Sequence, residues 1–179
     1  MSKHLLIEKK IEGQQIFKGK IIEVELDKVR LPNNSISTRE VVKHGGAVGI
    51  IPINDNRELI LVRQYRYPVG EALLEIPAGK LDQQEEPLAC AARELREETG
   101  FIAEEMVKVC DFFTSPGFSN EVIHLYMAKG LKQAGQMLDE DEFLNIEQVS
   151  LREAINYIYD GRIKDGKTIV GILAINNLE

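Results

Sequence analysis

Residues 79–101 read GKLDQQEEPLACAARELREETGF, a polar loop that leads into a segment with the apolar spacing of a helix. Pro87 suits the first helical position, where the missing N–H costs nothing, and Gly100 suits the position just past the last turn. The sequence therefore predicts a helix over residues 87–99. Its buried face is expected to carry the small and apolar side chains that recur at helical spacing: Leu88, Ala91, Ala92, Leu95 and Thr99.

Three acids, Glu94, Glu97 and Glu98, lie at i, i+3 and i+4 of this helix, so their carboxylates gather on one strip. Like charges at this spacing repel by roughly a few tenths of a kcal/mol per pair, and the last turn of a helix already carries the negative end of its dipole. The acids alone allow two interpretations. The strip is either a solvated acidic helix end or a set of hard oxygen ligands for Mg²⁺ or Mn²⁺.

The spacing of the whole stretch decides between these interpretations. Five residues separate Gly79 from Glu85, and seven more separate Glu85 from the triplet Arg93-Glu94-Leu95. One residue lies between this triplet and the pair Glu97-Glu98, and one more lies between that pair and Gly100-Phe101. Seven fixed identities at fixed spacing arise by chance at a rate on the order of 10⁻⁸ per starting position. The stretch resembles the Nudix box at every defining position. The resemblance implies a hydrolase for nucleoside diphosphates that are linked to another moiety.

The resemblance also implies a role for each polar residue of the box. Glu94 and Glu98 would be the principal ligands of Mg²⁺, with Mn²⁺ as an alternative, and the backbone carbonyl of Ala78 would be a further ligand. Glu97 would assist catalysis, Arg93 would orient the carboxylates and Glu85 would be a supporting acid.

Composition and charge restrict the class of protein. The chain has 179 residues, of which 44% are hydrophobic and 28% are charged, and its net charge of −7 argues against a nucleic-acid partner. No apolar run suits a signal peptide or a membrane span. Cys90 and Cys110 are too few for a disulfide framework, so both are expected to be reduced thiols of a cytoplasmic protein.

The N-terminal segment alternates apolar and polar residues from about Gln15 to Val42, with a turn at Pro32-Asn33-Asn34, which predicts antiparallel strands. Unpaired strand edges need a cover, and a second copy of the chain would supply one. We therefore expect residues 1–43 to be a strand segment for dimerisation and substrate binding, and residues 44–179 to be the hydrolase domain of a homodimer. Arg39 is the candidate contact to the adenosine of the substrate.

Two β-rich runs at residues 48–53 and 58–66 are expected to form a hairpin, and residues 71–77 a strand that delivers the box loop. The second run ends in Arg63-Gln64-Tyr65-Arg66. It is either an amphipathic strand or a source of an arginine for substrate phosphates. By resemblance to Nudix enzymes that act on ADP-sugars, Arg66 is favoured over Arg63. Glu75 is either a substrate contact or a strand-edge acid.

Residues 106–114 and 121–128 read as two further strands joined by Ser115–Asn120. In the Nudix subgroup that hydrolyses ADP-ribose, a proline recurs about this far past the box, and here Pro116 lies sixteen positions after Gly100. This resemblance makes Pro116 a subtype marker and Glu121 a candidate contact to the terminal ribose.

Residues 139–142 are Asp-Glu-Asp-Glu, which is either a solvated acidic loop or, by resemblance to ADP-ribose hydrolases, a mobile catalytic loop. In the second case the resemblance would make Glu140 the general base and Glu142 an outer metal ligand. Residues two apart in an extended loop point to the same side, so both could face the site. Ser150 and Glu153 form a capping box that begins a helix, and a last helix is expected over about residues 165–177.

The expected fold is an α/β Nudix-type sandwich, in which helices cover both faces of a mixed sheet, with an N-terminal antiparallel strand segment added. The expected activity is Mg²⁺-dependent hydrolysis of ADP-ribose to AMP and ribose 5-phosphate. Alternatives are another ADP-sugar, a dinucleoside polyphosphate or NADH as substrate, or a Nudix sensor that binds ADP-ribose without cleaving it.

Overall fold

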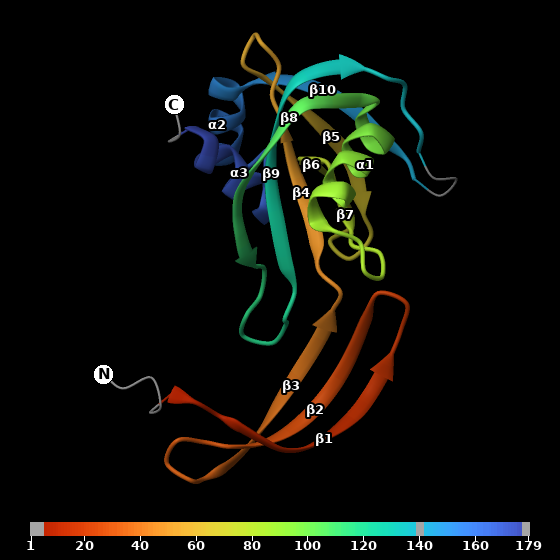
Figure 1. Ribbon diagram of the computed structural model, residues 1–179. Helices are drawn as coiled ribbons and strands as arrows, with labels where there is room; N and C mark the ends of the chain where they lie inside the picture. The colour runs from red at the N-terminus through yellow and green to blue at the C-terminus, as the bar shows by residue number, and fades with distance from the viewer. Residues whose placement is uncertain (1–5, 139–141, 177–179) are drawn as a thin grey trace. The chain divides into compact units, whose positions relative to one another are not determined.

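The computed structural model describes residues 6–138 and 142–176, which divide into two units (Figure 1). The N-terminal unit holds the described residues up to Gly46 together with Phe113–Val122. The core unit holds Ala47–Phe112 and the described residues from Ile123 onward. Within the described part of the chain, no helix is both long and apolar enough to span a membrane.

The N-terminal unit is an antiparallel sheet in which β2 (Ile22–Arg30) pairs with both β1 (Lys9–Lys18) and β3 (Ile36–His44). The antiparallel pairing agrees with the alternating sequence pattern, but the first strand begins at Lys9 rather than near Gln15. The chain turns between β2 and β3 through Asn34, which has a φ of 68°. Asn33 Oδ1 accepts hydrogen bonds from the backbone N–H and the hydroxyl of Ser35, which stabilises this turn.

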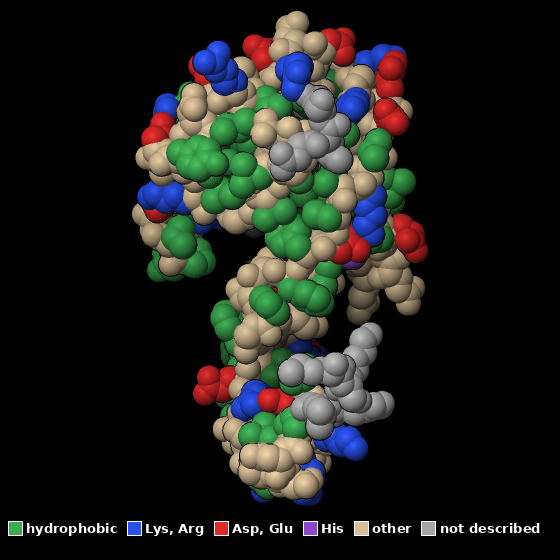
Figure 2. Space-filling model, turned by 90° about the vertical axis from the view of Figure 1, so that its left-hand side faces the viewer, with side chains coloured by type: hydrophobic (Ala, Val, Ile, Leu, Met, Phe, Trp, Pro, Cys, Tyr) green, Lys and Arg blue, Asp and Glu red, His purple; other side chains and the backbone are tan. Residues whose placement is uncertain are grey.

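Every residue of β1 is exposed, and large apolar side chains of this sheet remain in contact with solvent. Figure 2 shows hydrophobic side chains at the surface of both units. In the N-terminal sheet they are Ile11, Ile16, Phe17, Leu26 and Ile36. Ion pairs also cross this sheet, from Lys18 to Glu23 at 2.7 Å and from Lys10 to Asp27 at 2.7 Å.

The core unit contains two sheets. The four-stranded sheet has the order β7-β4-β9-β8, and β4 runs parallel to β9 and antiparallel to β7, so the sheet is mixed as predicted. The three-stranded sheet is antiparallel, with β5 between β10 and β6. The strands are β4 (Ala47–Pro52), β5 (Glu58–Arg66), β6 (Glu71–Glu75), β7 (Ala78–Lys80), β8 (Phe101–Phe113), β9 (Val122–Gln133) and β10 (Leu144–Ser150).

Strand β4 separates two apolar cores, because all six of its residues are buried and successive side chains point to opposite faces. On one face, Val48 and Ile50 pack against Ala91 and Leu95 of α1 (Pro87–Thr99). The other core includes Ile51 of β4 and residues of the second sheet and of helices α2 (Leu151–Tyr159) and α3 (Gly166–Asn176): Leu59, Leu61, Leu74, Ala154, Ile172 and Ile175. Helices therefore cover both sides, as Figure 1 shows within this unit.

The predicted bounds of α1 are confirmed, and Gly100 ends the helix with a φ of 73° and an N–H that donates to the carbonyl of Arg96. The predicted buried face was wrong in part, because Leu88 is 49% exposed and Ala92 is also exposed. The buried residues are Cys90, Ala91, Glu94, Leu95, Glu98 and Thr99. The buried stripe is rotated relative to the prediction, and it includes two of the box acids.

The predicted hairpin of residues 48–53 and 58–66 was also wrong. β4 and β5 belong to different sheets and are linked only by an isolated bridge between Ile53 and Leu59. The physical reason is that β7 and β9 occupy both edges of β4, so β5 must pair elsewhere. β10, a strand that the sequence analysis did not predict, supplies one of its partners.

The last two helices follow their sequence signals. Ser150 Oγ accepts a hydrogen bond from the N–H of Glu153, and the Glu153 side chain accepts one from the N–H of Ser150, so the predicted capping box of α2 is confirmed. At the start of α3, Asp165 Oδ2 accepts hydrogen bonds from the N–H of Thr168 at 3.0 Å and from its hydroxyl at 2.6 Å. Both cysteines are free, as predicted.

Candidate functional site

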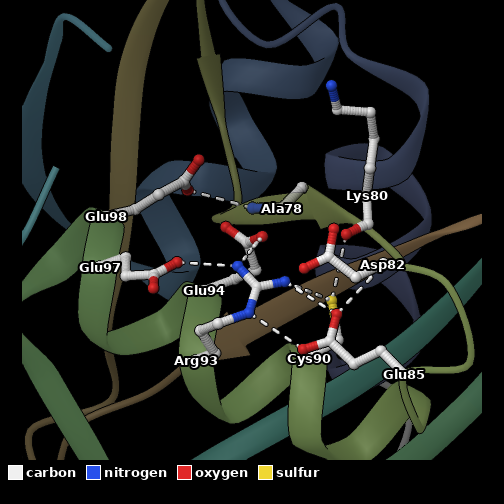
Figure 3. A network of polar contacts seen from close by, with 9 residues as sticks. All are labelled: Ala78, Lys80, Asp82, Glu85, Cys90, Arg93, Glu94, Glu97 and Glu98. Carbon is white, nitrogen blue, oxygen red and sulfur yellow. Dashed lines mark hydrogen bonds and ion pairs between the residues drawn. The ribbon is translucent and has the colours of Figure 1, made fainter. Parts of the chain in front are cut away.

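Arg93 lies at the centre of the polar residues of the box (Figure 3). Its guanidinium binds Glu85 through two hydrogen bonds, of 3.0 Å and 2.9 Å, and donates from Nη1 to Glu94 at 2.7 Å and to Glu97 at 2.8 Å. The hydrogen bonds from Arg93 lower the pKa of Glu85 to about 2. One arginine on α1 thus fixes three carboxylates, two from its own helix and one from the preceding loop.

Glu98 lies apart from this arginine, and its carboxylate is 2% exposed. Its Oε2 accepts a hydrogen bond of 3.1 Å from the backbone N–H of Ala78, which belongs to β7. Burial raises the pKa of Glu98 to about 8, and the like charges of Glu94 and Glu142 act in the same direction. The negative form of this side chain is therefore costly in the protein by itself.

Glu94 occupies a similar environment. It is 8% exposed, and burial raises its pKa despite the nearby Arg93, with further contributions from the charges of Glu97 and Glu142. A Cβ atom at position 79 would overlap the Glu94 carboxylate, so any larger residue there would displace that side chain. The chain of β7 thus passes directly against the Glu94 side chain.

These carboxylates fit a hard divalent cation. Two buried acids with raised pKa values, a third acid nearby and one arginine leave an excess of negative charge that a cation would neutralise. Glu94, Glu98 and the adjacent Ala78 backbone can supply its oxygen ligands. In the described part of the chain, no three His, Cys, Asp or Glu side chains already stand in an arrangement that would hold an ion.

The end of α1 is tied to the segment that leads into the acidic loop. The carbonyl of Gly100 accepts hydrogen bonds from the N–H groups of Ala134 and Gly135, and the carbonyl of Glu97 accepts one from Met137. The Gln136 side chain donates to the carbonyl of Glu98 at 2.6 Å. Residues 134–137 therefore satisfy carbonyls that the end of the helix leaves open.

The charge of Glu142 raises the pKa of both Glu94 and Glu98, so the structure brings this loop acid near the box. Glu140, the predicted general base, lies outside the described residues. Because residue 142 is distant from the box in sequence, only the resemblance had pointed to its proximity.

Arg66, at the end of β5, also lies near the box, because its charge acts to lower the pKa of Glu98. It binds Glu75 through two hydrogen bonds of 2.8 Å. Glu75 also contacts Lys167 of α3, a residue that the sequence analysis missed and for which the sequence offers no local signal. Arg63 points to a different partner, since it pairs with Glu147 of β10 at 2.5 Å.

The remaining predicted site residues belong to the N-terminal unit. Arg39 binds Glu8 through two hydrogen bonds of 2.9 Å and 2.6 Å. Glu121 accepts a hydrogen bond of 2.6 Å from Thr114 and faces Nδ1 of His44 at 3.5 Å. Pro116 lies in the same segment, which pairs with β3 through a bridge between Ser119 and Val42.

Comparisons with known proteins find matches to both parts of the chain. Residues 43–169 match the NUDIX domain, and residues 8–42 match the nucleoside diphosphate sugar hydrolase N-terminal domain. A solved structure described as an ADP compounds hydrolase has a TM-score of 0.87 at 22% identity, and the match covers 99% of this chain and 96% of that one. The predicted family resemblance and fold class are confirmed.

Curated relatives extend over most of the chain. A methanol dehydrogenase activator of Bacillus methanolicus is 46% identical over 94% of this chain and 92% of its own length. An ADP-ribose pyrophosphatase of Bacillus subtilis is 43% identical over 93% and 91%, respectively. A GDP-mannose pyrophosphatase of Yersinia enterocolitica is 37% identical over 74% of each chain.

The raised pKa of the buried Glu98 predicts how the stability of the metal-free protein depends on pH. With a pKa of about 8 in the folded state against 4.5 for the free side chain, Glu98 binds more protons when folded, so the free energy of unfolding should fall as pH rises from about 4.5 to about 8. The variant Glu98→Gln lacks this titrating group, so its free energy of unfolding should fall less over this pH range. At pH 8 its free energy of unfolding should exceed that of wild type by about 2–4 kcal/mol.

Urea unfolding in the presence of a chelator at pH 5 and pH 8 measures this difference. Glu97→Gln is the matched control, because Glu97 is on the same helix but its side chain is 33% exposed, and it should keep the pH dependence of wild type. Parallel pH profiles for wild type and Glu98→Gln would contradict the assignment of Glu98 as a buried, costly charge.

Proposed function

The chain belongs to the NUDIX family of hydrolases, and on this premise we propose that it hydrolyses the diphosphate of ADP-ribose to AMP and ribose 5-phosphate in a Mg²⁺-dependent reaction. The observation that carries the proposal is the pair of buried box carboxylates, Glu94 and Glu98, on α1. The relatives named ADP-ribose pyrophosphatase support the choice of substrate.

In this proposal Glu94, Glu98 and the carbonyl of Ala78 hold the cation. Mg²⁺ would act as a Lewis acid that offsets the charge of the diphosphate and of the transition state. Arg93 keeps the Glu94 and Glu97 carboxylates in fixed positions through its hydrogen bonds, and Glu85 in turn holds Arg93. This pre-organisation matters because groups that need not move when charge develops stabilise a transition state most effectively.

The residues around the box would bind the substrate and handle the proton. Arg66 would contact a phosphate, since it lies near Glu98 and its side chain is 38% exposed. A water molecule would attack phosphorus, and Glu140 would accept its proton, because a carboxylate that binds a metal has lost basicity. In the N-terminal unit, Arg39 would contact adenosine and Glu121 the terminal ribose, with Pro116 in the same substrate-contacting segment.

Another nucleoside diphosphate sugar is the second candidate for the substrate. The Yersinia relatives named GDP-mannose pyrophosphatase favour it over a dinucleoside polyphosphate or NADH. A sensor that binds ADP-ribose without cleavage would not need the box acids, and all of them are present here.

A substrate panel with Mg²⁺ tests the proposed function. Wild type should release AMP and ribose 5-phosphate from ADP-ribose with a higher kcat/KM than for GDP-mannose, diadenosine polyphosphates or NADH, as measured by chromatography of the products. A chelator should abolish activity and Mg²⁺ should restore it.

Glu98→Gln should lower kcat by roughly 10² or more, because it removes a charged ligand of the cation. Near-wild-type turnover of this variant would remove Glu98 from the metal site.

The acidic loop gives a separate prediction. Glu140→Gln should lower kcat with little change in the Mg²⁺ concentration for half-maximal rate, since a positioned base is worth roughly 10²–10⁴ in rate. Glu142→Gln should lower kcat and also raise that Mg²⁺ concentration, because Glu142 is the proposed outer ligand. If neither substitution slows turnover by more than about threefold, the loop is a solvated acidic turn and the base lies elsewhere.

We also propose that the protein is a homodimer in which β1–β3 cross to the partner and help to bind adenosine. Two features support the proposal: the exposed apolar side chains of this sheet, and an edge of β1 that pairs with no other strand among the described residues. Such surfaces are normally covered. Light scattering at micromolar concentration should give the mass of a dimer, and deletion of residues 1–42 should abolish both dimerisation and full activity. A fully active monomeric deletion variant would contradict the proposed dimer.

The cytoplasmic location of the protein stays a prediction.

A further inference from the structure

A row of alternating charges connects the first turn of α3 with Arg66. Asp165 Oδ1 lies 3.1 Å from Lys167 Nζ, and the Lys167 ammonium donates to Glu75 Oε2. Glu75 in turn binds Arg66 through two hydrogen bonds of 2.8 Å. The row joins elements that are remote in sequence, since Glu75 ends β6 and Arg66 ends β5.

Glu75 is the most deeply buried member of this row, with 1% of its surface exposed. Burial acts to raise its pKa, but the hydrogen bond from Arg66 and the charge of Lys167 outweigh that effect and lower it. A buried carboxylate needs such partners, because an unpaired charge away from water is very costly. Two cations therefore share one carboxylate.

Lys167 stands in an unfavourable place for its own helix. The first turn of a helix carries the positive end of the dipole, where a cation is destabilising. The side chain is nevertheless 12% exposed rather than extended into solvent. The helix does not need Lys167 as an anchor, because Asp165 already caps its start and the Thr168 hydroxyl accepts a hydrogen bond from the N–H of Ile76 at 2.8 Å.

The consequence of sharing Glu75 appears at Arg66. Without Lys167, Arg66 would be the only cation among the described residues that holds the Glu75 carboxylate. Lys167 gives Glu75 a second partner on α3, and Asp165 in turn pairs with Lys167. The Glu75 carboxylate is therefore held by groups on two sides, and the charge of Arg66, which it binds, acts on Glu98.

We propose that Lys167 is a positioning residue, which acts through Glu75 to hold the Arg66 guanidinium in place for a phosphate group of the substrate. The inference rests on the proposed function, because it assumes a diphosphate substrate. It assigns a role in substrate affinity to α3, which contributes no residue to the box.

Kinetics of Lys167 variants test the proposal. Lys167→Met should raise KM roughly tenfold or more, the range expected when a charge-assisted contact is lost, and should change kcat by less than about threefold. Lys167→Arg should keep KM within about threefold of wild type, because it retains the charge beside Glu75. Lys167→Gln serves as a second neutral variant if the methionine variant does not fold, as judged by circular dichroism.

Lys164→Met is the matched control. Lys164 precedes α3 and pairs with Glu71 of the same strand β6, at 3.0 Å, but both side chains are about half exposed, at 55% and 47%. Removing this surface pair should leave KM and kcat unchanged. An equal rise in KM for Lys164→Met would show that the effect is a general loss of positive charge.

A double-mutant cycle with Arg66→Met separates positioning from a merely structural role. If Lys167 acts through Arg66, Lys167→Met should change KM by less than about twofold in the Arg66→Met background. Independent, multiplying effects of the two substitutions would overturn the proposal. If ADP-ribose is not turned over but GDP-mannose is, the proposed substrate fails, and the same cycle run on GDP-mannose still decides the role of Lys167.

Discussion

The burial of negative charge on the packed face of α1 is the constraint on which the site depends. Glu94 and Glu98 lie on the same stripe as Ala91 and Leu95, so the helix cannot pack against its sheet without taking two carboxylates out of water. Arg93 and the N–H of Ala78 compensate only part of that cost. These two buried charges therefore make the packing of α1 locally costly, and a cation bound at the proposed site would relieve that cost.

Much of the fold can be predicted from sequence wherever the signal is local. Pro87, Gly100 and the Ser150 capping box set helix ends correctly because each acts through the backbone of its immediate neighbours. The helix face and the pairing of β5 were missed because they depend on remote partners. Which side of α1 is buried depends on β7, where Gly79 lets the chain approach Glu94, and β5 pairs with β10 because both edges of β4 are occupied.

The candidate site divides in the same way. The spacing of the box identifies its acids because they lie on one helix and one loop. Lys167 and its contact with Glu75 carry no such signal, since about ninety residues separate them in the chain. A lysine in the first turn of a helix is an exception to the usual dipole preference, and it became informative only when the structure showed the carboxylate that it serves.

The hydrogen bonds between the end of α1 and residues 134–137 also limit how the sequence can vary. A Cβ at Gly100 would collide with the backbone of Gln136, so the two segments approach too closely for other residues. Within this segment, a change in chain length would therefore disturb the anchor least between Met137 and the start of β10 at Leu144. Each added residue extends the reach of a chain by at most about 3.3–3.6 Å. A longer or shorter connection at this point would thus leave the geometry of α1 unchanged.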